Sequence, residues 1–208
     1  LTGSNSAADQ AAAAGQASLF EPSAAYRARV TETPAFRNWF GDSKVVDAEG
    51  RPLVVYHGSP QAGFEEFDVS NVGAFFSDRR DVASTYAGRS DDVEFAPTGA
   101  EFYDEAPGIY DAYLSLQNPM VMDWGGKDWG DGPEGLRLDD WAARARRQGF
   151  DGLIVENVVD TGWRAPGLAY DNSPSSVYVA FRPEQIKSAI GNDGSFDPAN
   201  PDIRFSRR

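Results

Sequence analysis

The sequence contains no cysteine and a single histidine among its 208 residues. Without cysteine the chain has no disulfide framework, no thiolate metal site and no cysteine nucleophile, and nothing in it points to an oxidising compartment. The one histidine, His57, excludes a histidine-rich metal site, and a Ser-His-Asp triad would have to be built on it. Because only carboxylates remain as strong metal ligands, we expect the chemistry to need no metal ion.

Basic residues and long apolar runs are also scarce. The chain carries 19 lysines and arginines against 32 aspartates and glutamates, a net charge of −13. Such a surface repels nucleic acid and anionic membranes over most of its area. No apolar run approaches the roughly 20 residues of a membrane span, and the N-terminus lacks the pattern of a secretory signal peptide. We expect no membrane association and, because the first residue is Leu1, a piece of a larger polypeptide.

The length is typical of one domain with a substantial core. Residues 1–25 are rich in Ala, Gly, Ser and Gln and poor in large apolar side chains, so we expect a flexible linker there. The folded domain is expected to span residues 26–208. Its strands outnumber its helices, which favours the α+β class.

The hydrophobic pattern and the turn residues predict the individual elements. Helices are expected near residues 34–40, 78–86 and 138–145, and strands near 52–58, 74–77, 109–116, 151–155, 177–181 and 186–190. Residues 91–111 carry many acids and no base, which favours a solvated loop. Residues 123–135 are rich in Gly, Asp and Trp and are expected to be irregular.

Two short stretches carry residues suited to binding. In Tyr56-His57-Gly58-Ser59, a histidine at the end of a buried strand precedes a glycine, which lets a flat ligand approach the backbone closely. In Gly73-Ala74-Phe75-Phe76-Ser77, the aromatic residues lead into a helix that carries Tyr86, and two aromatic walls can enclose a planar ring. The alternative is that these side chains belong to the core.

In this order the motifs resemble the diphtheria-toxin/poly(ADP-ribose)-polymerase branch of the ADP-ribosyltransferases. The run Tyr178 to Ser188 is similar to the strand pair that carries the third motif of that branch. The stretch from Pro34 to Ser206 is more closely similar to the transferase domains of phage MuF-type and polyvalent proteins. The resemblance implies an α+β fold with a split β-sheet core and a few flanking helices.

The resemblance also implies NAD⁺ as substrate. By this likeness His57 contacts a ribose hydroxyl, Gly58 holds the nicotinamide carboxamide through its backbone, and Phe75 and Tyr86 form the aromatic walls. The other expected NAD contacts are Ser59, Phe76 and Ser77. Cleavage between nicotinamide and ribose passes through an oxocarbenium-like transition state, which is stabilised by negative charge near the ribose.

The sequence departs from that branch at Val177, where the family pattern has a glutamate. Three replacements stay open as the catalytic polar group. Gln185 serves only if the chain bends at Pro183, because eight residues of extended strand span roughly 26 Å. Asp160 lies in a loop that can bring an acid over the cleft, and Glu156 lies at the end of its strand. For each, the alternative is a solvated or strand-capping side chain.

The function implied is mono-ADP-ribosylation of a macromolecular acceptor, by a phage host-takeover factor or a toxin effector. We expect it to act in the cytoplasm of a bacterial host or target cell, on a host protein, with a nucleic-acid acceptor left open. One alternative is a catalytically impaired NAD- or ADP-ribose-binding module, which the missing glutamate favours. The other is an NAD glycohydrolase, in which water is the acceptor.

Overall fold

The computed structural model describes residues 29–61, 63–87, 108–160, 162, 172–192 and 194–204. The expected linker at residues 1–25 and most of the expected acidic loop at 91–111 lie outside these ranges. None of the described helices is both long and apolar enough to cross a membrane.

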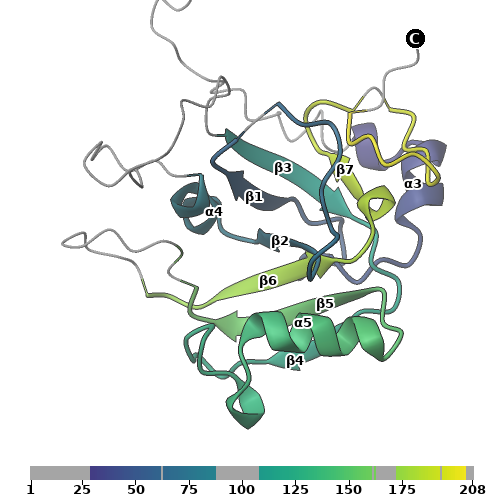
Figure 1. Cartoon of the computed structure of the whole chain (residues 1–208). Coiled ribbons are helices and arrows are strands. Elements are labelled where there is room, and N and C mark those ends of the chain that lie inside the picture. Colours follow the sequence, from purple (N-terminus) through teal and green to yellow (C-terminus); the bar gives the residue numbers. More distant parts are fainter. Residues whose placement is uncertain are drawn as a thin grey trace, which may run out of the picture.

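Within the described ranges, a seven-stranded mixed sheet organises the chain (Figure 1). In spatial order its strands are β4 (Met120–Asp123), β5 (Gly152–Val158), β6 (Ser175–Ala180), β2 (Ala74–Ser77), β1 (Val55–Ser59), β3 (Gly108–Leu114) and β7 (Ile186–Ser188). Neighbouring strands are antiparallel except β4 and β5, which are parallel. This sheet, with its few helices, confirms the predicted α+β class.

The sheet is nearly divided between β1 and β2. β1 pairs with β3 over five residues, from Val55 to Ser59. Among the described residues, the register of β1 with β2 is a single pair, Tyr56 opposite Ser77. β1 and β2 therefore separate beyond Tyr56, and the split core that the family resemblance implies is found at this seam.

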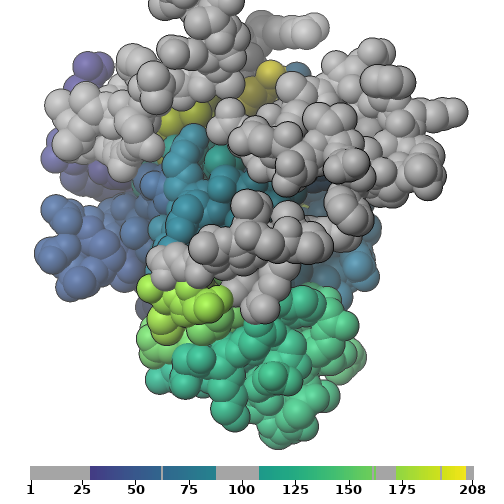
Figure 2. Space-filling model, turned by 90° about the vertical axis from the view of Figure 1, so that its left-hand side faces the viewer, coloured from purple at the N-terminus to yellow at the C-terminus, as the bar shows by residue number. Residues whose placement is uncertain are grey.

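Side chains of the central strands alternate between two apolar layers, as the pleat requires. On β6, Val177 and Val179 pack in the cluster beneath α5 (Leu138–Arg147), whereas Tyr178 and Ala180 belong to the cluster on the other face. α5 lies along β5 and β4 (Figure 1). In Figure 2 the segment with β4 and α5, coloured teal to green, forms the lower part of the molecule, below the blue segments that carry β1 and α4.

The helices begin and end where the sequence places them, to within a few residues. α3 (Pro34–Phe40) starts with the Thr33 hydroxyl accepting the N–H of Phe36, as expected of an N-cap. α4 (Arg80–Tyr86) starts two residues later than predicted. Short 3-10 turns, η2 (Pro133–Gly135) and η3 (Pro183–Gln185), precede α5 and β7.

The prediction missed β4. Its four residues follow Asn118-Pro119 and show no pattern strong enough to stand apart from the irregular stretch after them. β4 exists because Met120 to Asp123 pair in parallel with Leu153 to Glu156 of β5. Such a strand depends on a distant partner, which a local pattern does not contain.

Candidate active site

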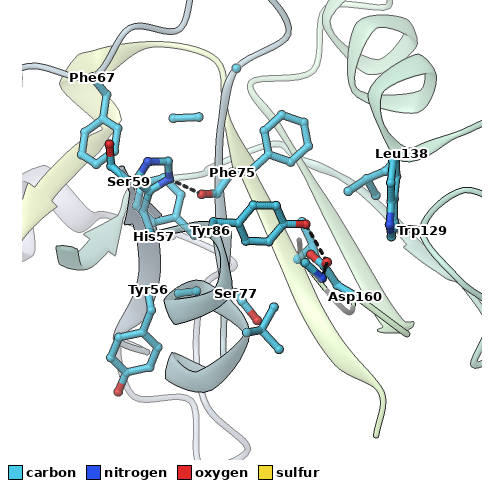
Figure 3. A pocket seen from close by; sticks show the side chains of 18 of the residues that line it. Tyr56, His57, Ser59, Phe67, Phe75, Ser77, Tyr86, Trp129, Leu138 and Asp160 are labelled. Atoms are coloured by element: carbon cyan, nitrogen blue, oxygen red, sulfur yellow. Dashed lines mark hydrogen bonds between the residues drawn. The ribbon is translucent and has the colours of Figure 1, made fainter. Parts of the chain in front are cut away.

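A cavity of about 1070 Å³ opens where β1 and β2 separate, with α4 on one side and the segment leading into α5 on another. This volume is slightly above the usual range for small-molecule sites. The predicted site residues that line it are His57, Gly58, Ser59, Phe75, Phe76, Ser77, Tyr86 and Asp160. In the view of Figure 3, His57 and Phe67 lie at one end, Asp160, Trp129 and Leu138 at the other, and Phe75 and Tyr86 between them.

His57 is held in one orientation. Its Nδ1 lies 2.7 Å from the carbonyl oxygen of Phe75, and because a carbonyl only accepts, Nδ1 carries the proton. Burial lowers the pKa of the imidazole below its ordinary value of 6.5, and the bond to Phe75 only partly offsets this. The ring is therefore neutral, and Nε2 is left with a lone pair that can accept from a hydroxyl group.

Aromatic rings surround the imidazole. Phe67 and Phe76 have ring centroids 5.0 and 5.5 Å from that of His57, and Phe64 and Tyr110 lie slightly farther away. The functional and the core interpretations of His57 are therefore compatible: one side packs among aromatic rings, and the same residue lines the cavity.

Gly58 is required by the packing of α4. A Cβ atom at this position would lie 1.7 Å from the carbonyl oxygen of Ala83 and 2.9 Å from the amide nitrogen of Ala87. The sequence interpretation, that glycine leaves room for a ligand, is therefore incomplete, because the backbone of α4 occupies that space. The close approach has a second effect: it brings α4, and with it Tyr86, against the strand that carries His57.

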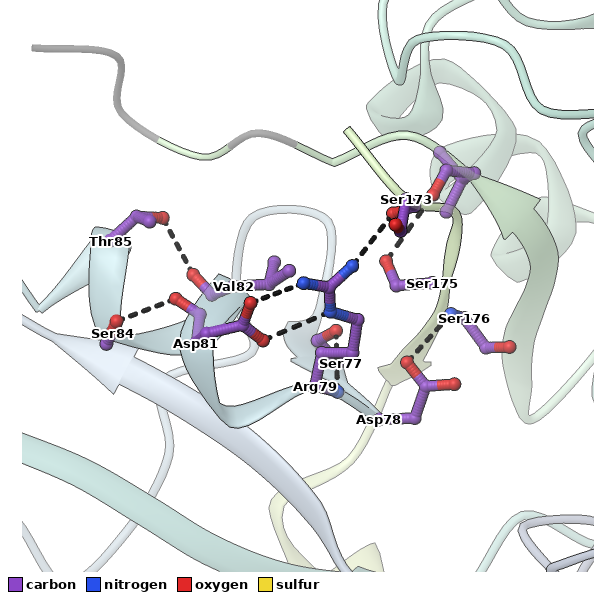
Figure 4. Close-up of polar contacts among 11 residues, drawn as sticks. Ser77, Asp78, Arg79, Asp81, Val82, Ser84, Thr85, Ser173, Ser175 and Ser176 are labelled. Carbon is purple, nitrogen blue, oxygen red and sulfur yellow. Dashed lines mark hydrogen bonds and ion pairs between the residues drawn. The ribbon is translucent and has the colours of Figure 1, made fainter. Parts of the chain in front are cut away.

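The hydroxyl groups of Ser59 and Ser77 have local partners. The Ser59 Oγ donates to the carbonyl oxygen of Gln61 over 2.6 Å. The Ser77 Oγ accepts the N–H of Arg79 over 3.1 Å and so shapes the turn into α4 (Figure 4). Both residues line the cavity, but both hydroxyl groups also stabilise turns.

Tyr86 and Asp160 form a hydrogen-bonded pair at the wall of the cavity. The Tyr86 hydroxyl donates to Oδ1 of Asp160 over 2.6 Å, and the N–H of Gly162 donates to the same oxygen over 3.0 Å. Burial raises the pKa of both the phenol and the carboxyl group. The nearby carboxylate of Asp128 raises the pKa of Asp160 further.

The structure corrects the expectation that Gln185 reaches the cleft. The chain does bend at Pro183, through η3, but the Gln185 side chain is only 3% exposed and is not part of the cavity lining. Its Oε1 accepts the N–H groups of Phe181 and Arg182, and its Nε2 donates to the carbonyl oxygens of Ser115 and Asp151. All of its hydrogen-bonding capacity is used within the fold.

The other candidates for the missing glutamate differ in whether they line the cavity. Glu156 is exposed on β5 and lies outside the cavity lining. Val177, at the position of the family glutamate, is 2% exposed and lines the cavity opposite Ser77 of β2. Of the three replacements considered, only Asp160 lies in the cavity.

The sequence analysis missed one side of the site. Asp128, Trp129, Leu138 and Asp139 also line the cavity. The first two lie in the segment expected to be irregular, where Asp128 forms a parallel bridge with Val159. Leu138 and Asp139 begin a helix that was predicted, but nothing in its periodicity distinguishes a cavity wall from core packing. The described residues include no cluster of three or more potential ligands that could hold a metal ion.

The split seven-stranded sheet, with a cavity at the seam beside His57-Gly58, defines an α+β fold of the ADP-ribosyltransferase kind. The family model for ADP-ribosyltransferases in polyvalent proteins matches residues 47–196, and the chain belongs to this family. The expected family is thereby confirmed. No curated protein matches the sequence.

Proposed function

We propose that the chain is a mono-ADP-ribosyltransferase that binds NAD⁺ in this cavity and transfers ADP-ribose to a macromolecular acceptor. The observation that carries the proposal is the hydrogen bond from Nδ1 of His57 to Phe75. It fixes a neutral imidazole whose Nε2 accepts a ribose hydroxyl, next to the backbone of Gly58 and the rings of Phe75 and Tyr86. The family match supports the reaction class.

The charge of the cavity suits this chemistry. Its described lining contains four aspartates, at positions 68, 128, 139 and 160, and no lysine or arginine. The nicotinamide ring of NAD⁺ is cationic, and the ribosyl group becomes cationic as the glycosidic bond breaks. Carboxylates in a partly closed site stabilise such a cation more strongly than they would in water.

The reaction breaks one bond and forms another. The electron pair of the bond between C1′ and the nicotinamide nitrogen leaves with nicotinamide, which becomes neutral. The acceptor's nucleophilic atom then bonds to C1′ and loses its proton to water. The aromatic walls hold the leaving group, and His57 orients the ribose.

We further propose that the acceptor is a bacterial host protein and that the chain acts in the bacterial cytoplasm, as a phage host-takeover factor or toxin effector. This setting is suggested by the resemblance of Pro34 to Ser206 to the transferase domains of phage MuF-type and polyvalent proteins. A nucleic-acid acceptor is the other possibility. The specific observation that favours a catalytically impaired binding module is Val177 in place of glutamate.

The test is the fate of NAD⁺ labelled in its adenylate part, incubated with the purified chain and a bacterial lysate. We expect label on macromolecules, with protease or nuclease sensitivity identifying the acceptor class. Free labelled ADP-ribose as the main product would assign an NAD glycohydrolase. Binding of NAD⁺ without any nicotinamide release would assign the impaired module.

A further inference from the structure

Among the described residues, Asp160 has one carboxylate oxygen held by the protein and one that is not. Both described hydrogen bonds, from the Tyr86 hydroxyl and the Gly162 N–H, end on Oδ1. The residue is only 9% exposed, yet it lines the cavity. A buried carboxylate without a cationic partner is costly, and the described residues supply no such partner to Asp160, so its Oδ2 beside a ligand-sized cavity calls for an explanation.

A β-bulge directs this side chain into the cavity. The register of β5 with β6 runs from Val155 opposite Val177 to Val158 opposite Ser175, so β5 contains one extra residue. Asn157, within the bulge, has a positive φ of 54°. An extra residue reverses which face the following side chains occupy. Val158 thus packs in the same cluster as Val155, and Asp160 follows on that face.

Contacts with α4, which carries Tyr86, fix the position of the backbone that follows Asp160. A Cβ on Gly162 would lie 1.6 Å from the Oγ1 of Thr85, so the backbone after Asp160 lies directly against α4. Figure 4 shows how the start of α4 is tied to the start of β6. Arg79 donates to the carbonyl oxygen of Ser173, and Asp78 accepts the N–H of Ser176. α4 is thus anchored to β6 at its start and contacts the backbone after Asp160 near its end. These contacts set the distance between Tyr86 and Asp160.

We propose that Asp160 replaces the glutamate absent at Val177: its Oδ2, to which no described residue is hydrogen-bonded, stabilises the ribosyl cation, while Tyr86 and Gly162 hold Oδ1 in place. This inference rests on the proposed function. As the C1′–N bond breaks and its electron pair leaves with nicotinamide, positive charge spreads over C1′ and the ring oxygen of the ribose. The carboxylate faces that charge until the acceptor bonds to C1′. Tyr86 is then both an aromatic wall and the residue that positions the catalytic carboxylate.

The protonation of Asp160 gives the proposal a second readout. Its pKa lies above the ordinary 3.8, chiefly because of burial, and the bonds from Tyr86 and Gly162 pull it back down. The charged groups that face the pair are Asp128, which raises the pKa of both residues, and Asp139, which raises that of Tyr86. Turnover that needs the ionised carboxylate falls as the pH drops through this raised pKa. The acid limb of the pH–rate profile is this fall in turnover at low pH. Removal of the Tyr86 hydroxyl raises the pKa of Asp160 and so moves the acid limb to higher pH.

The experiment compares Asp160→Asn with Glu156→Gln in nicotinamide release and in NAD⁺ binding by calorimetry. The amide introduced by Asp160→Asn still accepts from Tyr86 and Gly162, and Glu156 is an exposed acid outside the cavity. We expect Asp160→Asn to remain folded, to bind NAD⁺ within about threefold of wild type, and to lose turnover by roughly a hundredfold, as when one electrostatic stabiliser is removed from other active sites. Glu156→Gln should retain wild-type turnover. Tyr86→Phe should shift the acid limb upward.

Wild-type turnover in Asp160→Asn, or an unshifted acid limb in Tyr86→Phe, would overturn the inference and leave the proposed function standing. Equal losses of binding and turnover in Asp160→Asn would also overturn it, because the carboxylate would then act on substrate binding alone. A wild-type chain that releases no nicotinamide is a separate outcome, since it refutes the proposed function before any variant is compared.

Discussion

Nδ1 of His57 and the carbonyl oxygen of Phe75 lie 2.7 Å apart across the seam where β1 and β2 separate. This hydrogen bond joins the two motifs that the sequence suggested separately, the His-Gly strand end and the aromatic strand. It also fixes the protonated nitrogen of the ring. The orientation of the only histidine is therefore set by the backbone of the residue whose side chain forms one wall of the cavity.

His57→Ala tests whether this residue acts on NAD⁺. We expect at least a tenfold loss of turnover or of binding, because a ribose hydroxyl left unsatisfied in a closed site costs more than about 1.4 kcal/mol. The variant should remain folded, although it also loses aromatic packing. The control is Phe36→Leu, which weakens the core between α3 and β3 at a residue that does not line the cavity. A His57→Ala chain that melts early yet turns over NAD⁺ normally at low temperature would assign His57 to the core alone.

The lowered pKa of His57 predicts how stability changes with pH. Because the native pKa lies below 6.5, the unfolded chain binds this proton more tightly than the native one. The contribution of the neutral His57 imidazole to stability is thus fully present above about pH 6.5. It is lost as the pH falls toward the lowered native pKa. Compared with His57→Gln, the wild type should lose up to about 1.4 kcal/mol of unfolding free energy per pH unit in that window. Denaturant unfolding of both proteins from pH 8 to pH 5 measures this difference, and a constant difference would contradict the neutral, buried imidazole.

Tyr86→Ala removes one aromatic wall. We expect NAD⁺ to bind more weakly by about 1–2 kcal/mol, the size of aromatic stacking contributions. Tyr86→Phe keeps the ring and should keep the affinity. Calorimetric titration with NAD⁺ distinguishes the two variants, and an unchanged affinity in Tyr86→Ala would remove Tyr86 from the slot.

Gly58→Ala should destabilise the fold by about 3 kcal/mol, because the new Cβ overlaps the Ala83 carbonyl oxygen and forces α4 away from β1. The matched control is Gly130→Ala, whose Cβ would have only an ordinary contact of 3.4 Å, with Asp128. Thermal unfolding should separate the two by many degrees. Equal melting temperatures would show that α4 does not need this close approach.

Strong local patterns predicted half of this site. The strand Ala74–Ser77 was expected at its observed bounds, because its aromatic residues are bounded by a glycine and by polar residues that start a helix. His57-Gly58 was singled out at the end of its own predicted strand, and Tyr86 on the helix that follows Ala74–Ser77. Their roles came from the resemblance to the ADP-ribosyltransferases. These features depend on residues close together in the sequence, so their order and spacing carry the information.

The other half depends on contacts between distant residues. The bulge at Asn157 arises from the pairing of β5 with β6, and without it the direction of Asp160 could not be deduced. Gln185 looked like a free polar residue, but its four partners come from three separate segments. Asp128 and Trp129 join the cavity only because the backbone there bridges to Val159. None of these relationships leaves a periodic signal in the sequence.

The most direct test of the central claim is a crystal structure of the chain with a non-hydrolysable analogue of NAD⁺. The account predicts the nicotinamide ring between Phe75 and Tyr86, its carboxamide on the backbone of Gly58, and Nε2 of His57 within about 3 Å of a ribose hydroxyl. Oδ2 of Asp160 should face the ribose. An analogue bound outside the cavity lined by His57 and Tyr86, or none bound at saturating concentration, would contradict the account.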